Sequence, residues 1–340
     1  MVSSHKKILF RLVIVVAVIA CWLAGMEGYL RHKFGLAAGE NPDVFALPLT
    51  GSIHQPSSVY GLYWELTPGM TANFQKKIVT INNEGLRDDE TNFAPNLNGP
   101  RVLCLGDSIT FGAHVGDRET FEKKLTLYWN GTKNTRTHRP LMQVINAGVS
   151  GYNGTQMAAA FFARWWRFDP DLLVIGFFND DLSPVYQPPV LDWFAAMEQR
   201  FVLYRWARHQ WHKLRDTKLD YPIVFGDSPG NAAMRDNLAA FERLIVHMRD
   251  RGKKTLFVIH PDFREPELSA QARLLLPLLQ QYDVPWIEMM PIYKEASGGH
   301  PLIYSAIPES FDPHPNAKGH ELIAKSILKK IDSEGLLPKK

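Results

Sequence analysis

Short apolar runs alternate with longer amphipathic segments over most of the chain. Leu172–Phe178 is a continuous apolar run of strand length, and Arg101–Leu105 and Thr255–His260 are similar. A strand that is apolar on both faces is buried on both faces, which is typical of parallel sheets covered by helices. The alternation therefore predicts an α/β fold, a three-layer α/β/α sandwich around a central, mostly parallel sheet.

The same alternation places the individual elements of the sandwich. A helix is expected where apolar residues recur at helical spacing, and a strand where a short apolar run lies between turn residues. The expected strands are Arg101–Leu105, Gln143–Asn146, Leu172–Phe178, Thr255–His260 and Pro285–Glu288. The expected helices are Glu119–Trp129, Gly154–Phe168, Met234–Arg251, Ser269–Tyr282 and Gly319–Asp332.

The N-terminus carries basic residues followed by a long apolar segment. Residues 5–7 are His-Lys-Lys and precede the apolar run Leu12–Met26. The whole segment has roughly the 20 residues needed to span a bilayer. We predict an uncleaved membrane anchor (an N-terminal transmembrane helix) over residues 1–34, with the main domain outside the cytoplasm, in the periplasm or the extracellular space. A cleaved signal peptide is the alternative, and residues 18–21 also resemble a lipoprotein processing site.

Two further segments depart from the α/β alternation. Residues 35–100 begin with a linker rich in Gly, Pro, Ser and Asn and continue with short strand-like pieces such as Ile78–Ile81, which predicts a small β-rich lead-in. Residues 101–335 form the main domain, and residues 183–230 interrupt it with an aromatic and basic insertion. The aromatic residues of this insertion are expected to pack onto the core; the alternative is a substrate lid or a patch that touches the membrane surface.

Composition excludes several classes of function. The formal net charge is only +3 and the basic residues form no dense run, so no nucleic-acid partner is expected. The chain has 2 cysteines, Cys21 and Cys104, too few for a disulfide framework or a cysteine-rich zinc site. The 12 histidines are dispersed without the spacing of metal ligands, so no metal and no cofactor are expected.

Polar loops follow several of the predicted strands, and one more precedes the last helix. These loops are Gly106–Ser108, Asn146–Gly151, Asn179–Asp180 and Asp312–Asn316. The carboxyl ends of parallel strands share one edge of the sheet, where ligands bind. A catalytic serine needs a histidine base, a carboxylate that orients the histidine, and donors for the developing oxyanion. The four loops contain all of these residue types, so we expect them to meet in one cleft.

In their order along the chain, these blocks resemble the SGNH, or GDSL, hydrolase superfamily, whose members are esterases, lipases, thioesterases and enzymes that modify O-acyl groups on carbohydrates. The blocks read Gly-Asp-Ser-Ile-Thr-Phe-Gly, Asn-Ala-Gly-Val-Ser-Gly, Asn-Asp and His-Pro-Asn-Ala-Lys-Gly-His, and the resemblance covers about residues 100–335. It implies a flavodoxin-like parallel sheet and a site that needs no cofactor.

The resemblance also implies roles for individual residues. Ser108 would be the nucleophile and would contribute its own N–H to the oxyanion hole, to which Gly151 adds a second backbone N–H and Asn179 a side-chain donor. His314 would be the general base, oriented by the carboxylate of Asp312.

The chain departs from the family pattern at two positions. Phe177 stands where the family usually has a glycine, two residues before the asparagine. One residue separates Asp312 from His314 where two are usual, so Glu309 stays open as an alternative orienting carboxylate.

Two further candidates have simpler interpretations. His320 is a second possible base, but it lies in the predicted last helix, where a helix-surface or core histidine is expected. A second Gly-Asp-Ser, at residues 226–228, leads into Pro229–Gly230 and is interpreted as a turn.

The expected function is that of a membrane-anchored serine esterase that hydrolyses acyl esters, O-acetyl or short-chain, through an acyl-enzyme on Ser108. The alternative is an O-acetyltransferase that uses the same residues to acylate cell-surface polysaccharide, since the sequence leaves open whether water or a sugar hydroxyl receives the acyl group. A third hypothesis, from a different class, is a non-catalytic binding module with the same fold. The expected partners are an acylated glycan or lipid substrate and the membrane.

Overall fold

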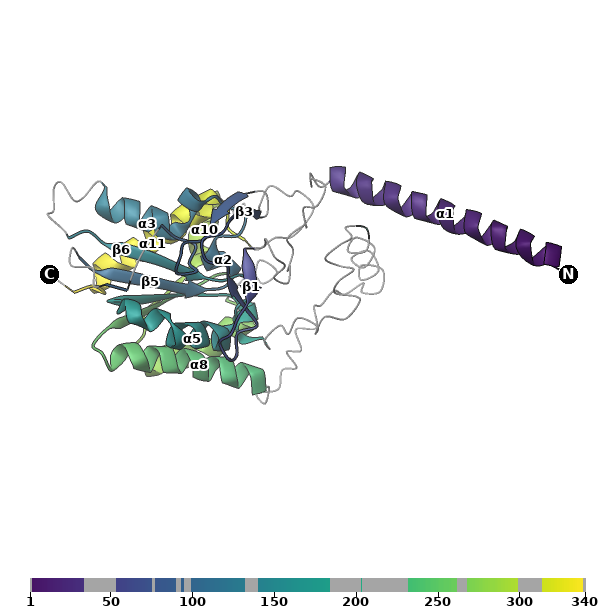
Figure 1. Ribbon diagram of the computed structural model, residues 1–340. Helices are drawn as coiled ribbons and strands as arrows, with labels where there is room; N and C mark the ends of the chain where they lie inside the picture. Colours follow the sequence, from purple (N-terminus) through teal and green to yellow (C-terminus); the bar gives the residue numbers. More distant parts are fainter. Residues whose placement is uncertain are drawn as a thin grey trace. The chain divides into compact units, whose positions relative to one another are not determined.

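The computed structural model divides the chain into two units (Figure 1). One unit consists of Met1–Leu47 and Gln187–Phe225, and the other of Pro48–Tyr186 and Gly226–Lys340. The residues that the structure describes are 2–33, 53–74, 77–89, 93–94, 99–131, 140–183, 203, 232–261, 268–298 and 314–338. Apart from residues 183 and 203, the predicted insertion at 183–230 lies outside them.

In the first unit, the described element is a long N-terminal helix, α1 (Val2–Lys33). Its apolar side chains are exposed, including Val16, Val18 and Trp22, each of which is more than half exposed. Among the residues described, no helix is both long enough and apolar enough to cross a membrane. The predicted anchor at residues 1–34 therefore gains no support from the structure and stays a prediction.

The second unit is built on a five-stranded sheet with the order β6-β5-β7-β8-β9, in which every neighbouring pair is parallel. In the central register, Cys104 of β5 lies between Asn146 of β6 and Val174 of β7. The sheet confirms the prediction of a central parallel sheet. Its strands are β5 (Arg101–Gly106), β6 (Gln143–Gly148), β7 (Leu172–Phe177), β8 (Lys254–Ile259) and β9 (Trp286–Glu288).

Helices cover both faces of this sheet, because successive side chains of a strand point to opposite faces. Leu103 and Leu105 belong to one buried cluster, together with α5, α8 and α9, whereas Val102 and Cys104 belong to a second cluster with α3, α10 and α11. Figure 1 shows α5 and α8 on one side of the strands and α3 and α11 on the other. The predicted three layers are confirmed. The helices are α3 (Phe121–Asn130), α5 (Gly154–Ala163), α8 (Ala232–Arg249), α9 (Ala270–Gln281), α10 (Met289–Ser297) and α11 (Ala317–Glu334).

Two helices differ from the prediction. The helix expected over Gly154–Phe168 ends at Ala163 and is followed by a separate 3-10 turn, η2 (Trp165–Phe168). Helix α10 was not predicted at all. It begins at Met289, directly after Glu288 at the end of β9, with no turn residues between the two elements, so no loop signal marks the boundary.

The lead-in forms two small antiparallel hairpins that pack on the main domain. The first pairs β1 (His54–Pro56) with β2 (Trp64–Leu66), and the second pairs β3 (Thr71–Phe74) with β4 (Lys77–Thr80). Buried residues of both hairpins share a hydrophobic cluster with the sheet. The Phe74 ring, for example, lies edge-on to Phe111, 5.5 Å between centroids.

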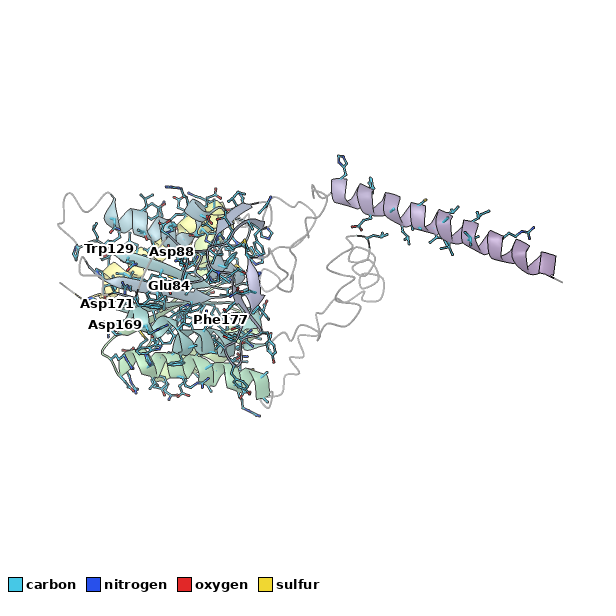
Figure 2. All side chains as sticks on the ribbon, viewed as in Figure 1. Glu84, Asp88, Trp129, Asp169, Asp171 and Phe177 are labelled. Carbon is cyan, nitrogen blue, oxygen red and sulfur yellow. The ribbon has the colours of Figure 1, made fainter. Side chains whose placement is uncertain are left out.

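The order of the strands determines where a ligand can bind. After β5 the chain proceeds outward to β6 and then crosses to β7 on the other side of β5. In open α/β sheets, ligands bind at the carboxyl ends of the strands where the order reverses in this way. Figure 2 labels Asp171 beside the amino end of β7 and Phe177 at its carboxyl end, and so marks the two edges of the sheet. At the amino ends of the strands, Asp171 forms an ion pair with Lys253.

Candidate active site

Ser108 lies at the carboxyl edge of the sheet, directly after β5. It is the first residue of a one-turn helix, α2 (Ser108–Phe111), which is capped by Asp107 and ended by Gly112 in the left-handed conformation, with φ 90°. The cap is a hydrogen bond from the N–H of Ile109 to Asp107 Oδ1, 2.9 Å long. At the start of a helix the first N–H groups have no intrahelical acceptor. The N–H of Ser108 therefore projects from the same turn as its hydroxyl.

His314 meets Ser108 from the far end of the sequence. Its Nε2 lies 2.7 Å from Ser108 Oγ, although the two residues are 206 positions apart. When the Oγ–H donates to Nε2, the ring proton of His314 is on Nδ1. The segment is held by Asn316, whose side chain caps α11 by accepting the N–H groups of Lys318 and Gly319. The structure thus brings together the predicted nucleophile and the predicted base.

The carboxylate that orients His314 was predicted to be Asp312, with Glu309 as the alternative. Both residues lie outside the described part of the chain. Both assignments therefore stay predictions.

Asn179 begins the 3-10 turn η3 (Asn179–Leu182) that follows β7. The Asn179 side chain is buried, and its Oδ1 accepts the hydroxyl of Ser269 at 2.5 Å. Asp181 closes the turn, since its Oδ2 accepts the N–H of Phe178 at 2.8 Å. Because β7 neighbours β5 in the sheet, Asn179 and Ser108 follow adjacent strands.

The loop that follows β6 carries Gly151, which has φ 80°. The loop is attached to the end of β5 by a 3.1 Å hydrogen bond from the N–H of Val149 to the carbonyl of Gly106. On its outer side, the indole N–H of Trp64 donates to the carbonyl of Ser150 at 3.2 Å. The loop is therefore held between the lead-in and the strand that precedes the nucleophile.

Two buried carboxyl groups, those of Asp107 and Asp181, belong to these turns. Burial raises the pKa of Asp107, although the N–H of Ile109 and the charge of His314 act in the opposite direction. Burial also raises the pKa of Asp181 well above its ordinary value, and the neighbouring carboxylate of Asp107 adds to this rise. This rise favours the uncharged form of Asp181, while the same turn also carries the exposed Asp180.

Sequence reasoning missed a group of residues that brace the nucleophile turn. Arg87, from the lead-in, is buried and donates to the carbonyl oxygens of Phe111, Gly112 and Val115 at 2.9, 2.5 and 2.6 Å. Its Nε also donates to Asp117 at 3.1 Å. An arginine in a turn-rich segment has no pattern that would reveal these contacts.

Asp88, the neighbour of Arg87 and labelled in Figure 2, contacts the adjoining strand β6. Its Oδ2 accepts the N–H of Asn146 at 3.1 Å, and it forms an ion pair with Lys123. The Asn146 side chain in turn donates to the carbonyl of Thr110 in α2 at 3.1 Å. The lead-in therefore supports the nucleophile helix both directly and through β6.

His114 is a further residue of the site that the sequence did not single out. It adopts the left-handed region with φ 66°, which is uncommon for a residue with a side chain. Its ring lies edge-on to that of His314, with 5.3 Å between centroids. The loop braced by Arg87 thus places a second imidazole against the predicted base.

Two other residues that could take part in catalysis, His320 and Cys104, are buried in the core instead. His320 is buried in α11, accepts the N–H of Phe121 on Nδ1 at 3.2 Å, and has a pKa that burial lowers well below its ordinary value. The expectation of a core histidine is confirmed. Cys104 is buried in β5, and burial raises the pKa of its thiol well above the usual range. The second Gly-Asp-Ser lies outside the described residues.

Among the residues that the structure describes, no cluster of three or more His, Cys, Asp or Glu has the arrangement of a metal site.

Taken together, these contacts place Ser108, the predicted nucleophile, against His314, the predicted base, at the carboxyl edge of a parallel α/β sheet. No protein-family model matches the sequence, and no curated protein matches it. Solved structures do resemble it. One is a two-domain esterase active on acetylated mannans, with 20% identity and a TM-score of 0.44 over 71% of this chain and 51% of that chain. The chain thus spans about half of that two-domain protein.

Two further solved structures are similar over most of their length. LAE5, an α/β hydrolase from the metagenome of Lake Arreo, Spain, has 16% identity and a TM-score of 0.44, over 73% of this chain and 99% of its own. A variant of Axe2, an acetyl-xylooligosaccharide esterase from Geobacillus, has 16% identity and a TM-score of 0.43, over 69% of this chain and 94% of its own. At these identities and TM-scores the likeness assigns neither a family nor an activity to this chain.

Proposed function

We propose that this protein is a serine esterase of the SGNH type that acts on acyl esters, O-acetyl or short-chain, through an acyl-enzyme on Ser108. The observation that carries the proposal is the 2.7 Å contact between His314 Nε2 and Ser108 Oγ. A serine hydroxyl is a weak nucleophile, and an adjacent imidazole is the usual means of activating it. The proposal also rests on the resemblance of the four sequence blocks to that superfamily.

In the first half of the reaction, Ser108 Oγ attacks the carbonyl carbon of the ester and its proton passes to His314 Nε2. The carbonyl oxygen becomes an oxyanion, which the N–H groups of Ser108 and Gly151 and the side-chain amide of Asn179 would stabilise. When the tetrahedral intermediate collapses, the bond to the alcohol oxygen breaks. The alcohol takes the proton from His314, and the acyl group remains on Ser108.

In the second half, an acceptor hydroxyl attacks the acyl-enzyme and gives its proton to His314. Water as the acceptor releases a carboxylic acid, whereas a sugar hydroxyl yields an acylated glycan. Both outcomes use the same residues, and exclusion of water from the cleft decides between them. Hydrolysis is the proposed reaction.

The nucleophile and the base are tested by substitution in the full chain with p-nitrophenyl acetate as substrate. Ser108→Ala and His314→Ala should each lower kcat by about four to six orders of magnitude, on the scale found when triad members are removed. Ser228→Ala changes the serine of the second Gly-Asp-Ser and is the matched control, which should retain full activity. Activity that survives Ser108→Ala would show that the nucleophile is another residue.

The acceptor is tested separately by adding an oligosaccharide to the same reaction. Release of acetate with no acetylated sugar detected by mass spectrometry supports hydrolysis. Acetylated oligosaccharide that accumulates with wild-type protein and not with Ser108→Ala would replace hydrolysis by transfer. Rates with acyl chains of increasing length distinguish an acylated glycan from a lipid as substrate, since a preference for long chains favours a lipid.

The location of the protein is a separate part of the proposal: a membrane-anchored chain whose catalytic domain lies outside the cytoplasm. What supports it is the sequence, in which the basic residues 5–7 precede the apolar run Leu12–Met26. Fractionation of cells that express the full chain should recover it with membranes after a carbonate wash, and recovery in the soluble fraction would contradict this.

A further inference from the structure

We propose that Ser269 is a positioning residue for the oxyanion hole, because it sets the orientation of the Asn179 side-chain amide. Neither the sequence blocks nor the resemblance assigns a role to Ser269. The inference rests on the proposed function, in which Asn179 is an oxyanion donor. It concerns how that donor is held and makes predictions of its own.

The contact between the two side chains is short and protected from solvent. Ser269 Oγ donates to Asn179 Oδ1 at 2.5 Å, and the residues are 4% and 2% exposed. Ser269 Oγ also accepts the N–H of Ala272 at 3.1 Å. A hydroxyl group has a single proton to donate. With the N–H of Ala272 on one of its lone pairs, the proton of Ser269 is directed to the amide oxygen.

This bond distinguishes the two ends of the amide. A primary amide has a carbonyl oxygen that accepts and an NH₂ group that donates. With Oδ1 of Asn179 bound to Ser269, Nδ2 is directed away from Ser269, as the proposed oxyanion donor would be. In the reversed orientation, the NH₂ group would face Ser269, and the buried hydroxyl proton would lose its acceptor. A buried donor without an acceptor is costly, and we expect this cost to favour the first orientation by roughly 10- to 100-fold.

Ser269 is itself firmly placed. It is the N-cap of α9, and it has the extended backbone typical of that position, with φ −61° and ψ 158°. The helix is held by Leu275 and Leu279, which are fully buried in the same hydrophobic cluster as β7. The orientation of the Asn179 amide is therefore coupled to the core of the domain, and a donor fixed before the reaction need not reorganise when the oxyanion forms.

The competing explanation is that Ser269 serves only to cap α9. The two roles predict different kinetics. Loss of a cap lowers the stability of the protein and leaves kcat unchanged in the fraction that is folded. Loss of the amide orientation lowers kcat with little effect on KM, because the donor acts on the transition state.

The first test is a double-mutant cycle in the full chain. Ser269→Ala should lower kcat by roughly 10- to 100-fold, and Ser269→Thr, which keeps the hydroxyl, should remain within about threefold of the wild-type rate. Ser269→Gly is included because glycine is a nearly adequate N-cap; it should fold stably and show the kcat of the alanine variant. Asn179→Ala should lower kcat by about 100- to 1000-fold, and adding Ser269→Ala to it should cause no further loss.

Two results would overturn the inference. One is an equal loss of kcat from Ser269→Ala in the wild type and in Asn179→Ala, which would mean that Ser269 acts independently of Asn179. The other is an unchanged kcat in folded Ser269→Gly. Circular dichroism and thermal unfolding of every variant establish that the fraction compared is folded.

A second measurement separates this inference from the proposed function. A fluorophosphonate forms a P–O bond to an activated serine with loss of fluoride, and its phosphoryl oxygen, on which negative charge develops in the pentacoordinate transition state, lies in the oxyanion hole. If the wild type is not labelled on Ser108, the proposed function fails. If the wild type is labelled, Asn179→Ala is labelled slowly, and Ser269→Gly is labelled at the wild-type rate, then the function stands and the role of Ser269 is wrong. The expected result is a rate for Ser269→Gly that lies roughly 10-fold or more below the wild type.

Discussion

The guanidinium group of Arg87 donates a 2.5 Å hydrogen bond to the carbonyl oxygen of Gly112, the residue that ends the helix carrying Ser108. Its further bonds, to the carbonyls of Phe111 and Val115, lie on both sides of that residue. A planar group with five N–H donors can bind several carbonyls of one loop at once, which an ammonium group cannot reproduce. The lead-in is thus part of the support for the nucleophile.

We therefore expect Arg87→Met to lower the free energy of unfolding by ~3 kcal/mol or more, because it leaves buried carbonyls and the carboxylate of Asp117 without their donor. Arg87→Lys keeps the charge but loses the planar set of N–H donors. Its free energy of unfolding should lie between those of Arg87→Met and the wild type. Urea unfolding measures both. Arg235 is exposed on α8, so Arg235→Met is the control and should change stability by less than ~0.5 kcal/mol. A similarly small change for Arg87→Met would mean that the contacts of Arg87 do not stabilise the protein.

Gly151→Ala should impair activity as well as stability. The residue has φ 80°, and a Cβ atom there would lie 3.2 Å from the ring of Trp64. The left-handed conformation costs a residue with a side chain about 1–2 kcal/mol, and relief of this strain would move the N–H that is proposed to bind the oxyanion. We expect a fall in kcat of at least roughly 10-fold in an esterase assay.

Gly252 supplies a matched control for the glycine at 151. It also adopts the left-handed region, with φ 67°, but a Cβ there would meet no atom within 4 Å. Gly252→Ala should therefore carry a similar cost in stability and leave kcat unchanged. Equal losses of kcat in the two variants would mean that the effect of Gly151→Ala is a general consequence of reduced stability.

The orienting carboxylate can be identified kinetically. We expect Asp312→Ala to lower kcat less than His314→Ala does, because the base still functions when its orientation is less well fixed. Glu309→Ala should leave kcat within about threefold of the wild type. A loss in Glu309→Ala that equals or exceeds that in Asp312→Ala would assign the orienting role to Glu309.

Glu122 predicts a dependence of stability on pH. Burial at the start of α3 raises its pKa well above the ordinary value, and the carboxylate of Asp88 adds to the shift. A carboxyl group whose pKa is raised on folding stabilises the protein fully below its unfolded pKa. This stability is lost as the pH rises toward the folded pKa, because the unfolded state then binds fewer protons.

Glu122→Gln keeps the shape of the side chain and removes its titration. We expect both proteins to have similar unfolding free energies near pH 4, and Glu122→Gln to become increasingly the more stable as the pH rises to 8. Denaturant unfolding at several pH values measures the difference. A gap that stays constant with pH would mean that Glu122 does not titrate in this way.

The fold could be predicted from the sequence because the signals for its strands and helices lie in short stretches of neighbouring residues. Leu172–Phe178 is an apolar run typical of a strand that is buried on both faces, and β7 occupies all but its last residue. Where the local signal is missing, the element was not predicted: α10 follows β9 with no turn residues between them. The same holds at the site, where the residues in recognisable blocks were found and those outside them were not.

By itself, the sequence determined the layered parallel sheet, the edge at which the site lies, and the identities of Ser108, Gly151, Asn179 and His314 as candidates. Only the tertiary structure decided that His314 Nε2 reaches Ser108 Oγ, and that Arg87 and Ser269 brace the loops around them. Periodicity and short motifs report on a few neighbouring residues. A hydrogen bond between residues 90 positions apart, such as that from Ser269 to Asn179, depends on how the helices pack on the sheet, and no local pattern encodes it.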